Sequence, residues 1–190
     1  MNIAGRRFFA YLIDMFIIAL ALFLLKQVIP TNKYEIELNN LNEDLLEEKI
    51  SYEDYFNQFK VLTHNIDKTN IGINVVNTIL LIVIFIVVPF VNNGQTIGQK
   101  LLKIKIVKDS GLQLEDLVGR AVIINGLGYM FFMFIILYLL PSNFYFIAIT
   151  LLGFFQIIMV IINGFMVLYR NDKRGVADKF TNTKIDVVKI

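Results

Sequence analysis

Long stretches of the chain consist of apolar residues with almost no charge among them. The stretch from Phe8 to Leu25 carries one charged residue, Asp14, and the stretch from Ile71 to Val91 carries none. A third uncharged stretch runs from Ala121 to Tyr169 and is more than twice as long. About 20 apolar residues cross the hydrocarbon core of a bilayer as a helix. The first two stretches therefore predict one membrane span each, and the third predicts two.

The sequence Pro141-Ser142-Asn143 interrupts the third stretch, because proline and asparagine favour a turn over a continued helix. We therefore expect an all-α membrane protein, a four-transmembrane-helix bundle whose third and fourth helices form a tight antiparallel hairpin. The predicted single membrane domain, 1–190, has spans near 8–27, 71–91, 118–140 and 143–169, an outer loop 28–70, an inner loop 92–117 and a tail 170–190.

Composition supports this class and excludes several others. Hydrophobic residues make up 56% of the chain and charged residues 18%, whereas soluble domains have about 45–50% and 25%. The absence of cysteine excludes disulfides, zinc–thiolate sites and cysteine nucleophiles. A net charge of +2 is too small to indicate nucleic acid. The first expected partner is therefore the lipid bilayer.

The distribution of lysine and arginine predicts the orientation. The N-terminus, the inner loop and the tail lie on one side of a four-span chain and hold 13 of the 18 basic residues, whereas the segment 26–70 has five lysines and nine carboxylates. We expect a multi-pass protein of the cell membrane with both termini in the cytoplasm.

Two segments on the predicted inner side alternate apolar and polar residues with the period of a half-buried strand. They are 103–108 and 183–188, and Asp109-Ser110-Gly111 after the first is typical of a hairpin turn. We expect a small cytoplasmic β-hairpin or sheet that contains both segments.

The outer loop predicts a short helical hairpin on the outer surface of the bundle. Ser51 is a suitable helix cap, and acidic residues follow it. The loop is either an acidic connector, the favoured interpretation, or a lid for a ligand or partner. The single histidine, His64, is expected to be solvated there.

Asp14 is the most informative polar residue, because a carboxylate inside a membrane costs on the order of 3 kcal/mol and normally faces a partner or a cavity. Asn125 and Asn163 are predicted at a similar depth, each followed by glycine, and Arg120 lies just below them. These four residues predict either a polar network that holds the helices together or a cation or proton site. On the residues alone, the structural role is favoured.

Several short motifs together resemble the RDD family of small bacterial membrane proteins, which is named for one arginine and two aspartates. The first is Arg7-x-x-Ala10 followed by Ile13-Asp14, and the second is the inner-loop run with Gly94, Thr96 and Gly98. Arg120 is similar to a recurrent arginine of the family, and the tail motif Arg174-Gly175-Val176-Ala177-Asp178 resembles the segment with the second aspartate. The resemblance covers nearly the whole chain outside the outer loop.

The sequence departs from the family pattern at three positions. Gln99 stands where lysine is usual, Ala177 replaces a frequent histidine, and Asn182 replaces a frequent glycine. The resemblance implies a possible transport role, such as exchange of small cations for protons.

Two functions from different classes follow. The first is a small-cation/proton transporter or a transporter subunit that uses Asp14. Its few spans and single intramembrane carboxylate would require a homo-oligomer or a membrane partner protein. The second is a non-enzymatic scaffold or regulator of partner proteins. No catalytic, metal-binding or cofactor motif is present, so no enzyme activity, no metal site and no cofactor are expected.

We also predict an ion pair between Arg7 and Asp178.

Overall fold

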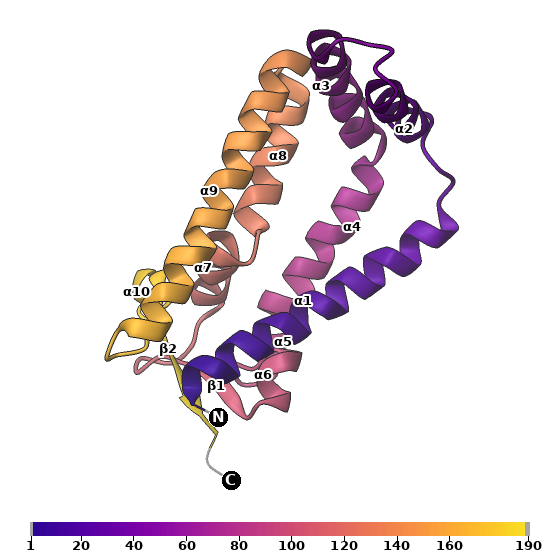
Figure 1. Ribbon diagram of the computed structural model, residues 1–190. Coiled ribbons are helices and arrows are strands. Elements are labelled where there is room, and N and C mark those ends of the chain that lie inside the picture. Colours follow the sequence, from indigo (N-terminus) through magenta and orange to yellow (C-terminus); the bar gives the residue numbers. More distant parts are fainter. Residues whose placement is uncertain (1, 189–190) are drawn as a thin grey trace.

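The computed structural model describes residues 2–188, and most of them are helical (Figure 1). The helices are α1 (Ile3–Val28), α2 (Lys33–Leu46), α3 (Tyr52–Thr69), α4 (Ile71–Ile82), α5 (Val88–Val91), α6 (Ile97–Leu101), α7 (Leu114–Ile124), α8 (Leu127–Leu139), α9 (Ser142–Tyr169) and α10 (Val176–Phe180). A π-helical segment, Val83–Val87, joins α4 to α5, and two strands, β1 (Ile104–Val107) and β2 (Lys184–Val187), complete the described chain.

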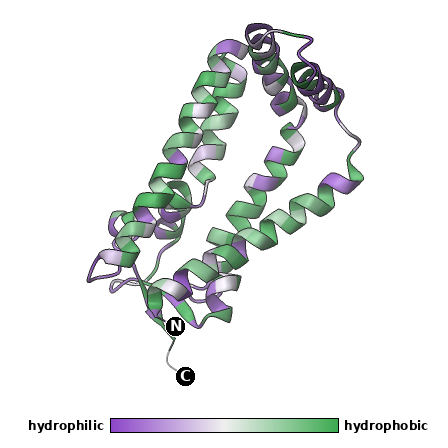
Figure 2. Cartoon of the chain, viewed as in Figure 1, coloured by the Kyte–Doolittle hydropathy of each residue, from purple (hydrophilic) through white to green (hydrophobic). Residues whose placement is uncertain are grey.

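Three helical segments are long and apolar enough to cross a membrane. They are α1, the continuous segment Ile71–Val91 that contains α4 and α5, and α9. Figure 2 shows that these segments and α8 are largely hydrophobic, whereas α2, α3 and the opposite end of the molecule carry most of the hydrophilic residues. This distribution is typical of a membrane protein with polar material at both ends.

The predicted third span, 118–140, is not one continuous helix. α7 ends at Ile124 and α8 begins at Leu127, with an angle of 66° between them. The physical reason lies in Gly126, whose φ of +84° has the left-handed conformation that glycine adopts without a steric penalty. Gln156 of α9 donates a 3.4 Å hydrogen bond to the carbonyl of Ile124, so the break has a polar partner inside the bundle.

The segment Ile71–Val91 contains the π-helical turns just before Pro89. Proline has no N–H to donate, and its ring would collide with the carbonyl of the residue four positions earlier in a regular helix. A local π-helical adjustment accommodates a proline within an apolar helix, so this segment stays continuous.

The outer loop forms the predicted helical hairpin. α2 and α3 pack against each other, and α3 also packs on α9. The hydroxyl of Ser51 accepts a 3.1 Å hydrogen bond from the N–H of Asp54, as expected for the cap of α3. The loop is therefore an ordered part of the fold.

The two alternating segments pair with each other. β1 and β2 are antiparallel, with Ile106 opposite Ile185, and they form a two-stranded sheet. The β-hairpin alternative is wrong. The chain does turn at Asp109-Ser110-Gly111, but β1 pairs with the distant tail strand and no strand follows the turn among the described residues.

Figure 1 shows two arms that are joined at one end by the sheet and the short helices and at the other end by α3, which contacts α4, α8 and α9. α8 and α9 lie side by side in one arm, and α1 and α4 form the other. The start of α1, the sheet, α6 and α10 gather at the end opposite α2 and α3. This end brings together the polar residues of four separate segments of sequence.

Candidate functional site

Asp14 is bound by the inner loop. Its side chain is almost fully buried, with 2% of the residue exposed. One carboxylate oxygen accepts a 2.6 Å hydrogen bond from the hydroxyl of Thr96, and the other accepts a 2.7 Å bond from the backbone N–H of Gly98. Both donors are uncharged, so the contact fixes the loop to α1 without an ion pair.

The predicted polar network of Asp14 with Asn125, Asn163 and Arg120 is therefore not formed. Asp14 forms no hydrogen bond with Asn125 or Asn163 and no ion pair with Arg120. The inner loop, expected below the membrane-spanning helices, instead folds back to the depth of Asp14. The start of α6, rather than α7 or α9, therefore supplies the hydrogen-bond donors to Asp14.

The inner-loop motif has a separate physical reason at each position. Gly94 has a φ of +84°, which favours glycine. Thr96 caps α6, where its hydroxyl and the side chain of Gln99 form a reciprocal capping box. A Cβ atom on Gly98 would lie only 2.1 Å from the carbonyl oxygen of Ala10, so only glycine allows α6 to approach α1 this closely.

The predicted Arg7–Asp178 ion pair is confirmed. Arg7 donates to one oxygen of Asp178 at 2.6 Å. Arg120 donates to the other oxygen and also, at 2.6 Å, to the hydroxyl of Thr183. The backbone N–H of Gly175 donates a further 2.8 Å bond to Asp178. One carboxylate therefore joins α1, α7 and the tail.

Asp178 is fully buried in this cluster. Burial by itself would raise the pKa of its carboxyl, but the positive charges of Arg120 and Arg7 outweigh burial and hold the pKa below its ordinary value. Asp178 is thus the ionised centre of the cluster.

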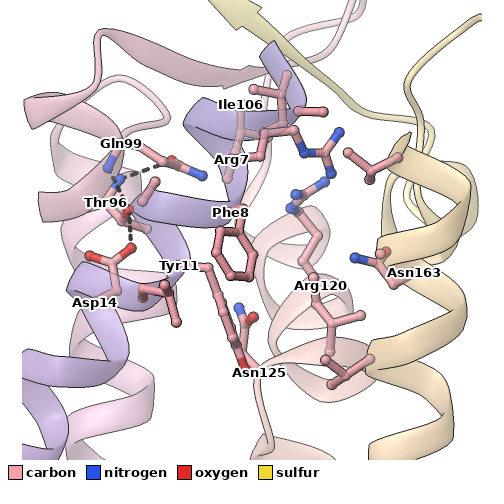
Figure 3. A pocket seen from close by; sticks show the side chains of 18 of the residues that line it. Arg7, Phe8, Tyr11, Asp14, Thr96, Gln99, Ile106, Arg120, Asn125 and Asn163 are labelled. Carbon is pink, nitrogen blue, oxygen red and sulfur yellow. Dashed lines mark hydrogen bonds between the residues drawn. The ribbon is translucent and has the colours of Figure 1, made fainter. Parts of the chain in front are cut away.

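A cavity of about 570 Å³ lies between α1 and α9 (Figure 3). The four residues that the sequence predicted as one site all line it: Asp14, Arg120, Asn125 and Asn163. They surround one space but do not bond to one another. The rest of the wall is mostly apolar and comes largely from α1 and α9, with single residues or pairs from α6, α7, the π-helical segment and both strands.

The two asparagines on the wall have different surroundings. Asn125 caps the C-terminus of α7 and is 8% exposed. The side-chain oxygen of Asn163 is buried and has no hydrogen-bond partner within the described part of the chain, and its amide nitrogen lies on the cavity side in Figure 3. Asn163 therefore presents an unused donor to the cavity.

Tyr11 also lines the cavity and was not among the predicted site residues. It lies four positions after Arg7 and three before Asp14, which places all three residues on one side of a helix. This spacing could have identified Tyr11 as a site residue from the sequence.

A second buried polar cluster lies at the other end of the bundle, where α3 meets the start of α9. The expectation that His64 is solvated is wrong, because only 4% of it is exposed. Its Nε2 lies 2.9 Å from the carbonyl oxygen of Leu137, and its Nδ1 lies 2.9 Å from the hydroxyl of Ser142. The carbonyl can only accept, so Nε2 donates to it, and a neutral ring then accepts from Ser142 through Nδ1.

The same cluster contains Asp67 and Tyr145. Tyr145 stacks on the ring of His64 and donates a 2.5 Å hydrogen bond to Asp67. Burial raises the pKa of the Asp67 carboxyl, and the bond from Tyr145 offsets part of the rise. The cluster ties α3 to α9, and no pattern in the sequence brought these residues together.

No group of three or more histidine, aspartate or glutamate side chains within residues 2–188 is placed to hold a metal ion.

Comparison with models of protein families gives a match to the RDD family over residues 3–182. The match covers nearly the whole chain, including the outer loop, so the chain belongs to this family. Comparisons with curated proteins and with solved structures gave no match.

Proposed function

We propose that this RDD-family chain is a four-span protein of the cell membrane that acts as a small-cation/proton transporter or as a subunit of one. The bent pair α7–α8 serves as the fourth span beside α1, α4–α5 and α9. Both termini lie in the cytoplasm, which puts the basic end of the molecule inside and the acidic hairpin α2–α3 outside.

The surroundings of Asp14 carry this proposal. A carboxylate within an apolar helix lies on the wall of a cavity and, among residues 2–188, accepts hydrogen bonds only from the neutral donors of Thr96 and Gly98. A permanent ion pair would hold it ionised, whereas neutral donors leave its charge to be balanced by a proton or a small cation. Because a hydroxyl both donates and accepts, Thr96 can keep its bond to Asp14 when that oxygen binds a proton.

The small size of the chain supports its assembly into a larger complex. One intramembrane carboxylate and four spans provide little material for a complete pathway, so we propose a homo-oligomer or a complex with a membrane partner protein. α9 offers a surface for such a contact, since most of its apolar side chains are exposed. We propose no enzymatic activity, no nucleic-acid partner and no resident metal or cofactor.

Reconstitution into liposomes with an imposed pH gradient and an internal pH-sensitive dye tests the proposal. The wild-type protein should move protons when Na⁺, K⁺ or Li⁺ is added outside. Asp14→Asn should abolish this movement and leave the fold intact, because its oxygen still accepts from Gly98 and its amide can donate to Thr96. Asp172→Asn, at an exposed tail position, is the matched control and should behave like the wild type.

A different outcome would favour the scaffold. The ordered hairpin α2–α3 and the β1–β2 sheet provide surfaces at both ends of the molecule. Absence of cation-dependent proton movement in the wild type, together with partner proteins that copurify with it, would contradict transport and support a regulator or scaffold.

A further inference from the structure

We propose that the cavity between α1 and α9 binds one anionic phospholipid, with its phosphate against Arg7 and Arg120 and an acyl chain along the apolar wall. The first support is the balance of charge. Two guanidinium groups, of buried Arg120 and of mostly buried Arg7, share a single carboxylate, that of Asp178. Burying an unbalanced charge is costly, so this cluster favours one additional anion.

Asp14 does not supply that anion. Its two oxygens are bound by Thr96 and Gly98. In Figure 3 its carboxylate points toward Thr96, away from the two guanidinium groups, with Phe8 and Tyr11 drawn between them.

Unused donors face the same space. A guanidinium group has five N–H bonds. Arg120 donates to Asp178 and Thr183 through one nitrogen only, and Arg7 donates to Asp178 and to the carbonyl of Lys173. The remaining N–H bonds have no partner among residues 2–188, and both residues line the cavity. Phosphate oxygens are well suited to such paired donors.

The rest of the cavity is suited to a hydrocarbon chain. Its volume of about 570 Å³ is within the range of about 300–1,000 Å³ typical of ligand sites. The apolar side chains along it include Phe8, Leu12, Ile124, Val160, Val167 and Leu168. Arg7 lies in the first two turns of α1 and Arg120 lies in α7, and their ion pairs with Asp178 join both to the tail. In the topology proposed above, this end of the bundle would lie at the level of the lipid phosphates. Basic pockets between helices on the cytoplasmic side favour anionic headgroups.

Gly164 allows the cavity to be filled without disturbing the arginines. It lines the cavity, and a Cβ atom there would have no neighbour within 4 Å. Gly164→Leu therefore places a side chain where the acyl chain would lie. Gly72→Leu is the matched control, because Gly72 also has open space around its Cβ position but does not line the cavity.

The experiment uses the full chain in detergent micelles, titrated with phosphatidylglycerol or phosphatidylcholine and followed by native mass spectrometry. The wild type should bind phosphatidylglycerol about tenfold more tightly than phosphatidylcholine, as expected for one partly buried charge. Gly164→Leu should lose about tenfold in affinity for phosphatidylglycerol, and Gly72→Leu should not. Arg7→Gln leaves a neutral Arg120–Asp178 pair and should bind both lipids equally.

Three results would overturn the proposal. They are equal binding of the two lipids by the wild type, unchanged binding by Gly164→Leu, and complete displacement of phosphatidylglycerol by millimolar inorganic phosphate, which would identify a site for a free anion. No ion gradient is present in this experiment, so its outcome is independent of the transport proposal. Size-exclusion profiles of the variants show whether each has folded.

Discussion

Arg7, in the first two turns of α1, donates a 2.6 Å hydrogen bond to Asp178, in the short helix that follows the last span. The bond joins the two ends of the chain at the end of the bundle opposite α2 and α3. Arg120 binds the other oxygen of the same carboxylate, so Asp178 holds three segments together.

Asp178→Asn should destabilise the protein strongly. The substitution removes the one charge that balances two buried guanidinium groups, and breaking a buried ion pair of this kind costs about 3–5 kcal/mol. For a chain of this size the melting temperature should fall by on the order of 10 °C. Thermal unfolding in detergent, read by size-exclusion chromatography, measures the effect, and exposed Asp172→Asn should melt like the wild type.

Exchanging the charges of the Arg7–Asp178 pair should not restore stability. A pair considered alone would tolerate Arg7→Asp with Asp178→Arg, but the arginine introduced at position 178 would lie against Arg120. We expect the double variant to melt well below the wild type, although it keeps one carboxylate and should exceed Asp178→Arg alone, which leaves three cations together. Recovery of the wild-type melting temperature would show that Arg120 contributes little to the cluster.

The sequence predicted those features that repeat with a regular period or depend on length. The apolar stretches predicted α1, α4–α5 and α9 because a span needs a minimum length, and alternation predicted β1 and β2. The Arg7–Asp178 pair followed from the predicted gathering of the basic segments at one end. The break at Gly126 was missed because one glycine after an asparagine is compatible with either a turn or a continued apolar helix.

The partners of Asp14 could not be predicted from depth along the helices. Counting residues compares spans with one another, but it gives no position to a loop that folds back between them. Gly98 was recognised only through the family motif, and its role depends on the approach of α6 to Ala10. His64 was misjudged for the same reason, since its burial depends on how α3 packs against α8 and α9.

Gly98→Ala should separate α6 from α1. The new methyl group would lie 2.1 Å from the carbonyl oxygen of Ala10, and relieving this overlap should cost about 1–3 kcal/mol. Hydrogen exchange should then become faster in α6 and in the backbone N–H that binds Asp14. Gly72→Ala, where the added methyl group meets no atom within 4 Å, should leave exchange unchanged, and equal behaviour of the two variants would show that α6 has room to move.

Asp67 should make the contact between α3 and α9 depend on pH. Burial raises the pKa of its carboxyl in the folded protein, so the folded state holds the proton more tightly than the unfolded state does. Stability should therefore decrease as pH rises from about 4, the ordinary pKa of aspartate, through the higher folded value, and should stay lower above it. Thermal unfolding of the wild type and of Asp67→Asn across this range measures the difference.

The asparagine variant keeps an oxygen that accepts from Tyr145 but cannot ionise, so its melting temperature should fall less with rising pH than that of the wild type. Because other groups titrate equally in both proteins, the difference between their two curves of melting temperature against pH gives the contribution of Asp67. Asp44→Asn, at a partly exposed position on α2, should reproduce the wild-type curve. Parallel curves for the wild type and Asp67→Asn would show that Asp67 has the same pKa in the folded and unfolded chains.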